Sequence, residues 1–97
     1  MSTRNFSILN VSMPTAGNEY SLVIPHGALD IIIKCRDTSN PLKVYTVSVG
    51  NQGNPGSYYT VDPGQVLVLE TKSDGQKFYL QSTGTNVVAE MLYHIDQ

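Results

Sequence analysis

The feature that most constrains the fold is the run at residues 29–36, Leu-Asp-Ile-Ile-Ile-Lys-Cys-Arg. It is the densest apolar run in the chain, it is rich in β-branched isoleucine, and turn residues bound it on both sides, as is typical of a strand. A period of two places Leu29, Ile31, Ile33 and Cys35 on one face and Asp30, Ile32, Lys34 and Arg36 on the other. The first face is a core face. The second has an apolar centre, which indicates either a strand covered on both sides or a strand that meets another subunit.

Seven further segments show strand character, separated by turns rich in glycine, proline and asparagine. They are residues 5–13, 20–24, 42–49, 58–61, 66–69, 77–81 and 87–95, with a bulge expected near Leu9 in the first. Asp-Gly at 74–75 predicts a hairpin between the strands at 66–69 and 77–81. Eight short strands in 97 residues predict one all-β domain, either a jelly-roll-like sandwich of antiparallel strands or a small barrel.

Composition argues against several classes of function. No segment approaches the roughly 20 apolar residues of a membrane span, and the first residues lack the apolar core of a signal peptide, so we expect assembly in the cytoplasm. The net charge is −2 with no basic cluster, which argues against nucleic-acid binding. Cys35 is the only cysteine, so no intrachain disulfide can form, and its inward position predicts a buried small hydrophobe.

Residues that carry catalysis or bind metals are sparse. His26 is expected in a turn, and His94 with Asp96 fits a terminal polar pair better than a pair of metal ligands. Three carboxylates occupy outward strand positions and are expected to be solvated: Asp30, Glu70 and Glu90. The chain has no nucleophile elbow and no glycine-rich phosphate loop that opens a helix. We therefore predict a protein that is not an enzyme and that binds no metal and no cofactor.

The strands carry more apolar surface than one small sandwich can easily hide. Their second faces hold Ile32, Val88 and Leu92, together with either Val66 and Val68 or Leu67 and Leu69. If these faces adjoin, they form an exposed patch of the kind that usually marks an interaction surface. The alternative is that these side chains lie under loops or inside a closed barrel.

A second candidate surface surrounds residues 50–57, where three glycines, two asparagines and one proline leave little that can pack. We expect a flexible surface loop, which is either a simple connector or a binding loop. The candidate contact residues here are Asn51, Asn54, Tyr58 and Tyr59. Tyrosine is enriched at interfaces because it combines apolar area with a hydrogen-bonding tip.

Several short segments follow one another in a characteristic order from about residue 22 onward. They are the Ile-Pro-His-Gly turn at 24–27, the strand end Ile-Lys-Cys-Arg at 33–36, the extended Tyr-Thr-Val-Asp-Pro-Gly at 59–64, and a closing hairpin formed by 78–82 and 87–90. Together they resemble the small all-β virion proteins of tailed bacteriophages, especially capsid decoration or cement proteins. The resemblance implies a jelly-roll-like sandwich, a dimer or trimer of this chain, binding to a shell of major capsid protein, and a place on the virion surface. It brings no catalytic residues.

Under this hypothesis, residues 1–5, a possible flexible arm, and the loop at 50–57 lie on the shell, and Ile32, Val88 and Leu92 pack against a neighbouring subunit. The first alternative is a module of a tail, fibre or adhesin that binds a carbohydrate or receptor through Tyr58 and Tyr59. The second is an enzyme or metal-binding sandwich that uses His94 and Asp96.

Overall fold

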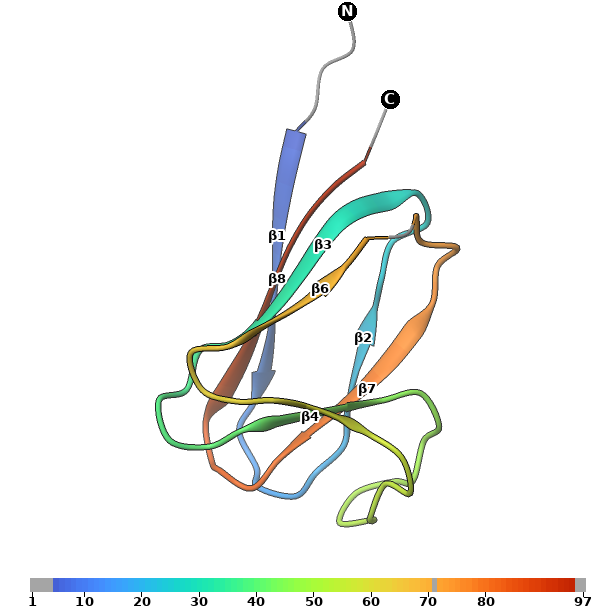
Figure 1. Cartoon of the computed structure of the whole chain (residues 1–97). Coiled ribbons are helices and arrows are strands. Elements are labelled where there is room, and N and C mark those ends of the chain that lie inside the picture. The colour runs from blue at the N-terminus through green and yellow to red at the C-terminus, as the bar shows by residue number, and fades with distance from the viewer. Residues whose placement is uncertain (1–4, 71, 96–97) are drawn as a thin grey trace, which may run out of the picture.

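The structure, a computed structural model, describes residues 5–70 and 72–95, and within these ranges it contains eight strands and no helix (Figure 1). The strands are β1 (Asn5–Met13), β2 (Tyr20–Val23), β3 (Ala28–Cys35), β4 (Leu42–Tyr45), β5 (Tyr59–Val61), β6 (Val66–Leu69), β7 (Lys77–Ser82) and β8 (Val87–Ile95). Except for β4, every end agrees with the predicted segments to within one residue.

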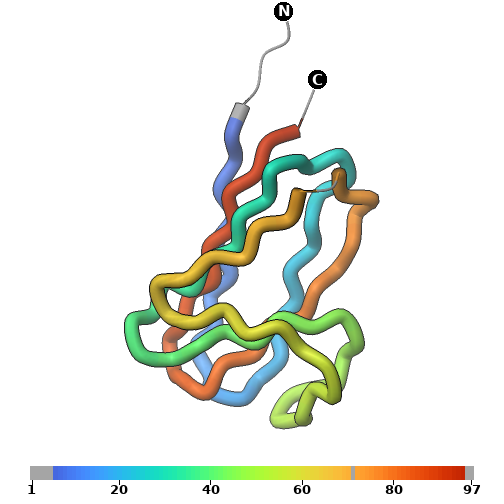
Figure 2. The backbone as a smooth tube through the Cα atoms, in the orientation of Figure 1, coloured from blue at the N-terminus to red at the C-terminus, as the bar shows by residue number. Residues whose placement is uncertain are grey.

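The strands form two four-stranded antiparallel sheets (Figures 1 and 2). Sheet A has the order β1-β8-β3-β6, and sheet B has the order β2-β7-β4-β5. The pairing is nested, as in one long hairpin: β1 pairs with β8, β2 with β7, β3 with β6 and β4 with β5. The first and third pairs lie in sheet A, and the second and fourth lie in sheet B. The predicted sandwich of eight short antiparallel strands is therefore confirmed.

The core lies between the sheets and is built from alternate residues of each strand. Ile31 and Ile33 of β3 and Met91 of β8 are fully buried, in one cluster with Val44 and Leu80 of sheet B. This is the inward face that the period of two predicts, because successive side chains of a strand point to opposite sides.

A β-bulge in β3 corrects the predicted position of one core residue. The register between β3 and β8 shifts between Leu29 and Ile32, and Asp30 adopts a left-handed φ of 50°. The extra residue reverses the alternation, so Ala28 is buried in the core and Leu29 is only partly buried. The prediction for Leu29 is wrong.

The bulge predicted near Leu9 is also wrong, because β1 pairs with β8 from Asn5 to Met13 without a register shift. The interrupted alternation has another cause. Phe6 and Ile8 point away from the core, whereas Val11 and Met13 lie on the core side. The apolar residues of β1 thus belong to two faces.

The two predicted hairpins are crossovers between sheets instead. Gly75 has the positive φ, 84°, that suits the predicted turn, but β6 and β7 lie in different sheets, and so do β7 and β8. The strand β4 ends at Tyr45, four residues before its predicted end at 49. It ends there because residues 46–57 leave the sheet and hydrogen-bond to the turn that follows β1.

Candidate interaction surfaces

The strand register brings two of the three predicted contact residues of sheet A side by side. Leu92 of β8 lies between Ile8 of β1 and Ile32 of β3, and Ile32 in turn lies opposite Val68 of β6. Directly opposed residues share a face of a sheet, so these four side chains form one apolar row across all four strands. The row lies on the face of sheet A that points away from the core.

Neighbouring side chains widen this row into a patch. We call the outer apolar face the surface formed by Phe6, Ile8, Ile32, Val66, Val68 and Leu92. Ile8 is 73% exposed and Phe6 is 65% exposed. A hollow of about 250 Å³ lies over the centre of the row. Of the two options left open by the sequence, Val66 and Val68 face outward, and Leu67 and Leu69 pack against the core.

Val88 lies on the same side of sheet A but apart from the row. It is opposite Ser12 of β1 and is separated from Leu92 along β8 by Glu90. Glu90 forms an ion pair with Arg36, with 2.9 Å between Nη2 and Oε2. Val88 therefore lies at the charged margin of the outer apolar face.

His94, predicted to form a terminal polar pair with Asp96, is buried at the other end of this face. It is 1% exposed, and its ring lies under the ring of Phe6, with 5.3 Å between the centroids. Its Nε2 lies 2.5 Å from Oδ2 of Asp30, which the β3 bulge directs toward it. Its Nδ1 has no hydrogen-bond partner among the described residues. Asp96, its predicted partner, lies outside the described residues.

Within residues 5–70 and 72–95, no group of three or more histidine, cysteine and carboxylate side chains could hold a metal ion. Cys35 is buried as predicted, and its thiol donates a hydrogen bond to the backbone oxygen of Asn40 over 3.3 Å. Burial raises the pKa of the Cys35 thiol, so little reactive thiolate forms near neutral pH.

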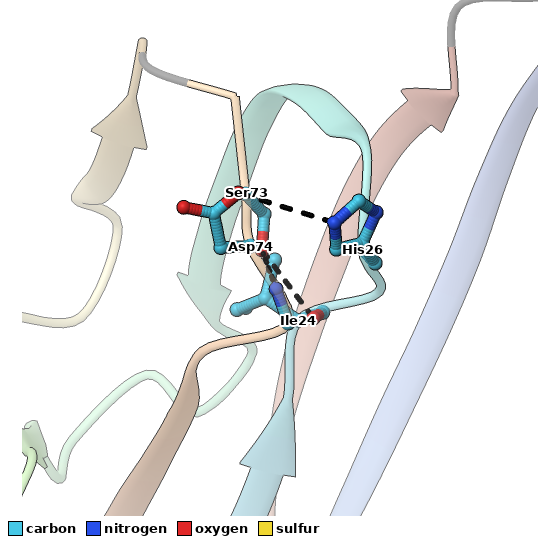
Figure 3. Close-up of polar contacts among 5 residues, drawn as sticks. Ile24, His26, Ser73 and Asp74 are labelled. Carbon is cyan, nitrogen blue, oxygen red and sulfur yellow. Dashed lines mark hydrogen bonds and ion pairs between the residues drawn. The ribbon is translucent and has the colours of Figure 1, made fainter.

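His26 lies in the predicted turn between β2 and β3 (Figure 3). Its Nε2 is 4.0 Å from Oδ1 of Asp74, and both side chains are exposed to solvent. The hydroxyl of Ser73 below them donates to the backbone oxygen of Ile24 and accepts from the backbone N–H of Gly75. The bond to Ile24 joins the two turns, and the bond from Gly75 lies within the second turn.

The loop after β4 is anchored, which corrects the prediction of a flexible segment with little to pack. The side chain of Gln81 donates to the backbone oxygens of Gly17 and Gly53, and that of Gln52 donates to the backbone oxygen of Ala16. Pro55 is buried. The loop thereby covers one end of sheet B and joins it to the turn after β1.

Glu19 is the centre of this anchor, and no motif in the sequence marks it as such. Its carboxylate accepts hydrogen bonds from the Tyr45 and Ser48 hydroxyls and from the backbone N–H of Val49, over 3.0, 2.5 and 2.8 Å. Burial opposes ionisation of Glu19, but these donors outweigh it and hold its pKa below the ordinary value. Burial, and then the neighbouring Glu19 carboxylate, raises the pKa of Tyr45.

The remaining candidates lie around sheet B, away from the outer apolar face. Asn51 and Asn54 are exposed, and Asn51 accepts a hydrogen bond from the backbone N–H of Glu19. Tyr58 and Tyr59 are about half exposed and border a hollow of about 370 Å³. The candidate residues therefore form two separate surfaces.

No protein-family model, curated protein or solved structure matches this chain. The described residues contain no helix that is long and apolar enough to cross a membrane.

Proposed function

We propose that this protein is a non-enzymatic structural protein that self-associates and binds a protein shell, as a capsid decoration protein does. The observation that carries the proposal is the outer apolar face. It crosses all four strands of sheet A and leaves Phe6 and Ile8 more than half exposed. An exposed apolar surface of this kind usually marks contact with another protein. The resemblance to small virion proteins of tailed bacteriophages makes the capsid shell the preferred partner.

Energetics supports a role for this face in binding. Burying one exposed side chain such as Ile8 or Phe6 stabilises a complex by roughly 1.5–3 kcal/mol. Lys34, Arg36 and Glu90 place both signs of charge beside the apolar residues. A polar margin of this kind around an apolar centre is typical of protein interfaces.

The strand order supports a finer description of the fold. The nested pairs β1–β8, β2–β7, β3–β6 and β4–β5 are distributed alternately over two sheets, as expected when an eight-stranded hairpin is rolled up. We propose that the sandwich is a jelly roll, an architecture common among capsid proteins. This assignment is independent of the partner.

Co-sedimentation with purified capsid shells tests the function. We expect Ile8→Glu and Leu92→Glu each to weaken shell binding at least tenfold, because a carboxylate would be desolvated in an apolar contact. Val23→Glu is the matched control, because Val23 is an exposed apolar residue on sheet B. Thermal unfolding of each variant confirms that it is folded. Undiminished binding by both sheet A variants would contradict the proposal.

One observation favours the carbohydrate-binding alternative. Tyr58, Tyr59 and Phe78 border the same hollow beside sheet B, and aromatic rings are suited to stacking on sugars. A glycan array with the purified protein tests this. Saturable binding that Tyr59→Ala abolishes, with no affinity for shells, would replace the capsid proposal by this one.

A further inference from the structure

The strand β6 is an edge of sheet A that has no charged residue, proline or bulge. It reads Val-Leu-Val-Leu, and among the described strands it pairs with β3 alone. Natural sheets protect an edge by keeping the strand very short or by placing a charge, a proline or a bulge within it. β6 is short, with four residues, but it has no charge, proline or bulge, so one row of its backbone N–H and C=O groups is open to another strand.

The interior of the sandwich is also open beside β6. The facing edge of sheet B is β5, which has three residues and leaves much of the inner side of β6 uncovered. Two hollows of about 280 and 370 Å³ lie here, and Leu69 and Phe78 border both of them. Leu67 and Leu69 point inward yet stay partly exposed. A strand added to β6 would cover these side chains.

We propose that β6 pairs antiparallel with β6 of a second copy of this chain, so that two sheets A join into one continuous sheet of eight strands. This inference rests on one part of the proposed function, the self-association of the chain, and it identifies β6 as the surface through which two copies associate. The outer apolar face is left free for the shell.

The pattern of β6 suits a copy of itself. A strand that pairs with β6 would cover the hollows with one face and extend the surface of Val66 and Val68 with the other, so it needs apolar side chains on both faces. A second copy of β6 meets this need, because β6 is apolar at every position. A two-fold axis through an antiparallel pair places one residue opposite its own counterpart, and directly opposed residues share a face. With Leu67 on the axis, Val66 meets the counterpart of Val68; with Val68 on the axis, Leu67 meets the counterpart of Leu69. Neither register opposes like charges.

The other edges of the two sheets fit less well. The strand β1 is longer, but Ser7, Asn10 and Ser12 interrupt its apolar residues. The edge β5 has only three residues, and although β2 is as long as β6, prolines follow both β2 and β5 within two positions. A proline cannot donate to a ladder of hydrogen bonds, so it limits the extension of a paired strand.

The joined sheet has a consequence for the proposed function. Val66 and Val68 are the β6 members of the outer apolar face, so pairing would place the two faces next to each other across the axis. The dimer would thus present one apolar surface of twice the extent. Two linked sites bind a repeating shell more tightly than one site does.

Single cysteines test the pairing in the full chain with Cys35→Ala as background. Light scattering should give twice the monomer mass of 10.6 kDa. Under mild oxidation we expect either Leu67→Cys or Val68→Cys, whichever lies on the axis, to form disulfide dimers at least tenfold faster than the other. Leu92→Cys, on the face rather than the edge, is the control and should cross-link slowly.

A proline pair provides a second test. Successive N–H groups of a strand point to opposite sides, so one of Leu67→Pro and Val68→Pro keeps the ladder to β3 and blocks only the free edge. That variant should unfold as cooperatively as the parent but have the monomer mass.

The outcomes separate this inference from the proposed function. A monomer at all concentrations, or a dimer in which only Leu92→Cys cross-links, would overturn pairing through β6, whether or not the chain binds shells. A β6 dimer that ignores shells would support the pairing and contradict the proposed partner.

Discussion

Glu19 shows how one side chain can hold a loop that looks unstructured in the sequence. It receives three hydrogen bonds from residues 45–49, and it lies in the turn between β1 and β2. Its partners are about 30 positions away along the chain, so no local pattern marks it. The same holds for His94, whose contacts with Asp30 and Phe6 depend on how three strands meet.

We expect Glu19→Gln to lower the stability by about 1 kcal/mol, because exposed charged hydrogen bonds are replaced by weaker neutral ones. The folded-state pKa of Glu19 is lowered, so its ionised form stabilises the fold at neutral pH and this contribution is lost as the pH falls through that lowered pKa. Chemical denaturation should therefore show a gap between parent and variant at pH 7 that narrows below roughly pH 4. A gap that persists unchanged in acid would contradict this role.

Glu70→Gln is the matched control, because Glu70 is exposed and lies just after β6. It should leave the stability within about 0.5 kcal/mol of the parent. Limited proteolysis adds a local measurement, since loosening of the loop at 46–57 should produce new cleavage there in Glu19→Gln alone.

At the scale of single strands, periodicity predicts where a strand lies better than which way each residue points. A period of two predicts alternation throughout residues 29–36, but the bulge at Asp30 moves Leu29 out of the core. Its sequence hides the bulge because apolar residues occur on both faces. In β1, by contrast, outward-facing apolar residues interrupt the alternation and so suggest a bulge, but the pairing with β8 has no register shift.

The bulge gives a sharp comparison between two small residues at position 30. Both Asp30→Gly and Asp30→Ala remove the contact with His94, but only glycine adopts a positive φ without steric cost. We expect Asp30→Gly to be more stable than Asp30→Ala by about 1 kcal/mol in urea denaturation. Equal stabilities would show that the backbone of β3 relaxes when the carboxylate is removed.

At the scale of the whole molecule, the sequence predicts the class of fold but not the assignment of strands to sheets. Turn residues such as Gly75 mark where the chain reverses, and the reversal is equally compatible with a hairpin and with a crossover. The sequence predicts Ile32, Val88 and Leu92 as contact residues, but Val88 lies at the margin of the outer apolar face, and the register that brings Ile8 and Val68 beside Leu92 and Ile32 is set by tertiary pairing.

The nested topology also predicts the speed of folding. β1 pairs with β8, so residues near 5 and 95 must come together before sheet A is complete. Contacts between distant residues slow folding because loops must close first. We expect refolding from denaturant to take milliseconds to seconds. Stopped-flow tyrosine fluorescence measures this rate. Refolding within microseconds would contradict this.

The pairing of Asn5 with Ile95 also determines how the molecule responds to mechanical force. Tension applied between these two residues pulls one end of the β1–β8 ladder apart, so its hydrogen bonds break one after another rather than together. Such an unzipping geometry resists little force. Tension applied along sheet A would instead shear whole strands past each other, which requires many bonds to break at once. A protein with this fold that reinforces a shell under internal pressure must therefore carry the load through contacts on its sheet faces and edges, and not through residues near 5 and 95.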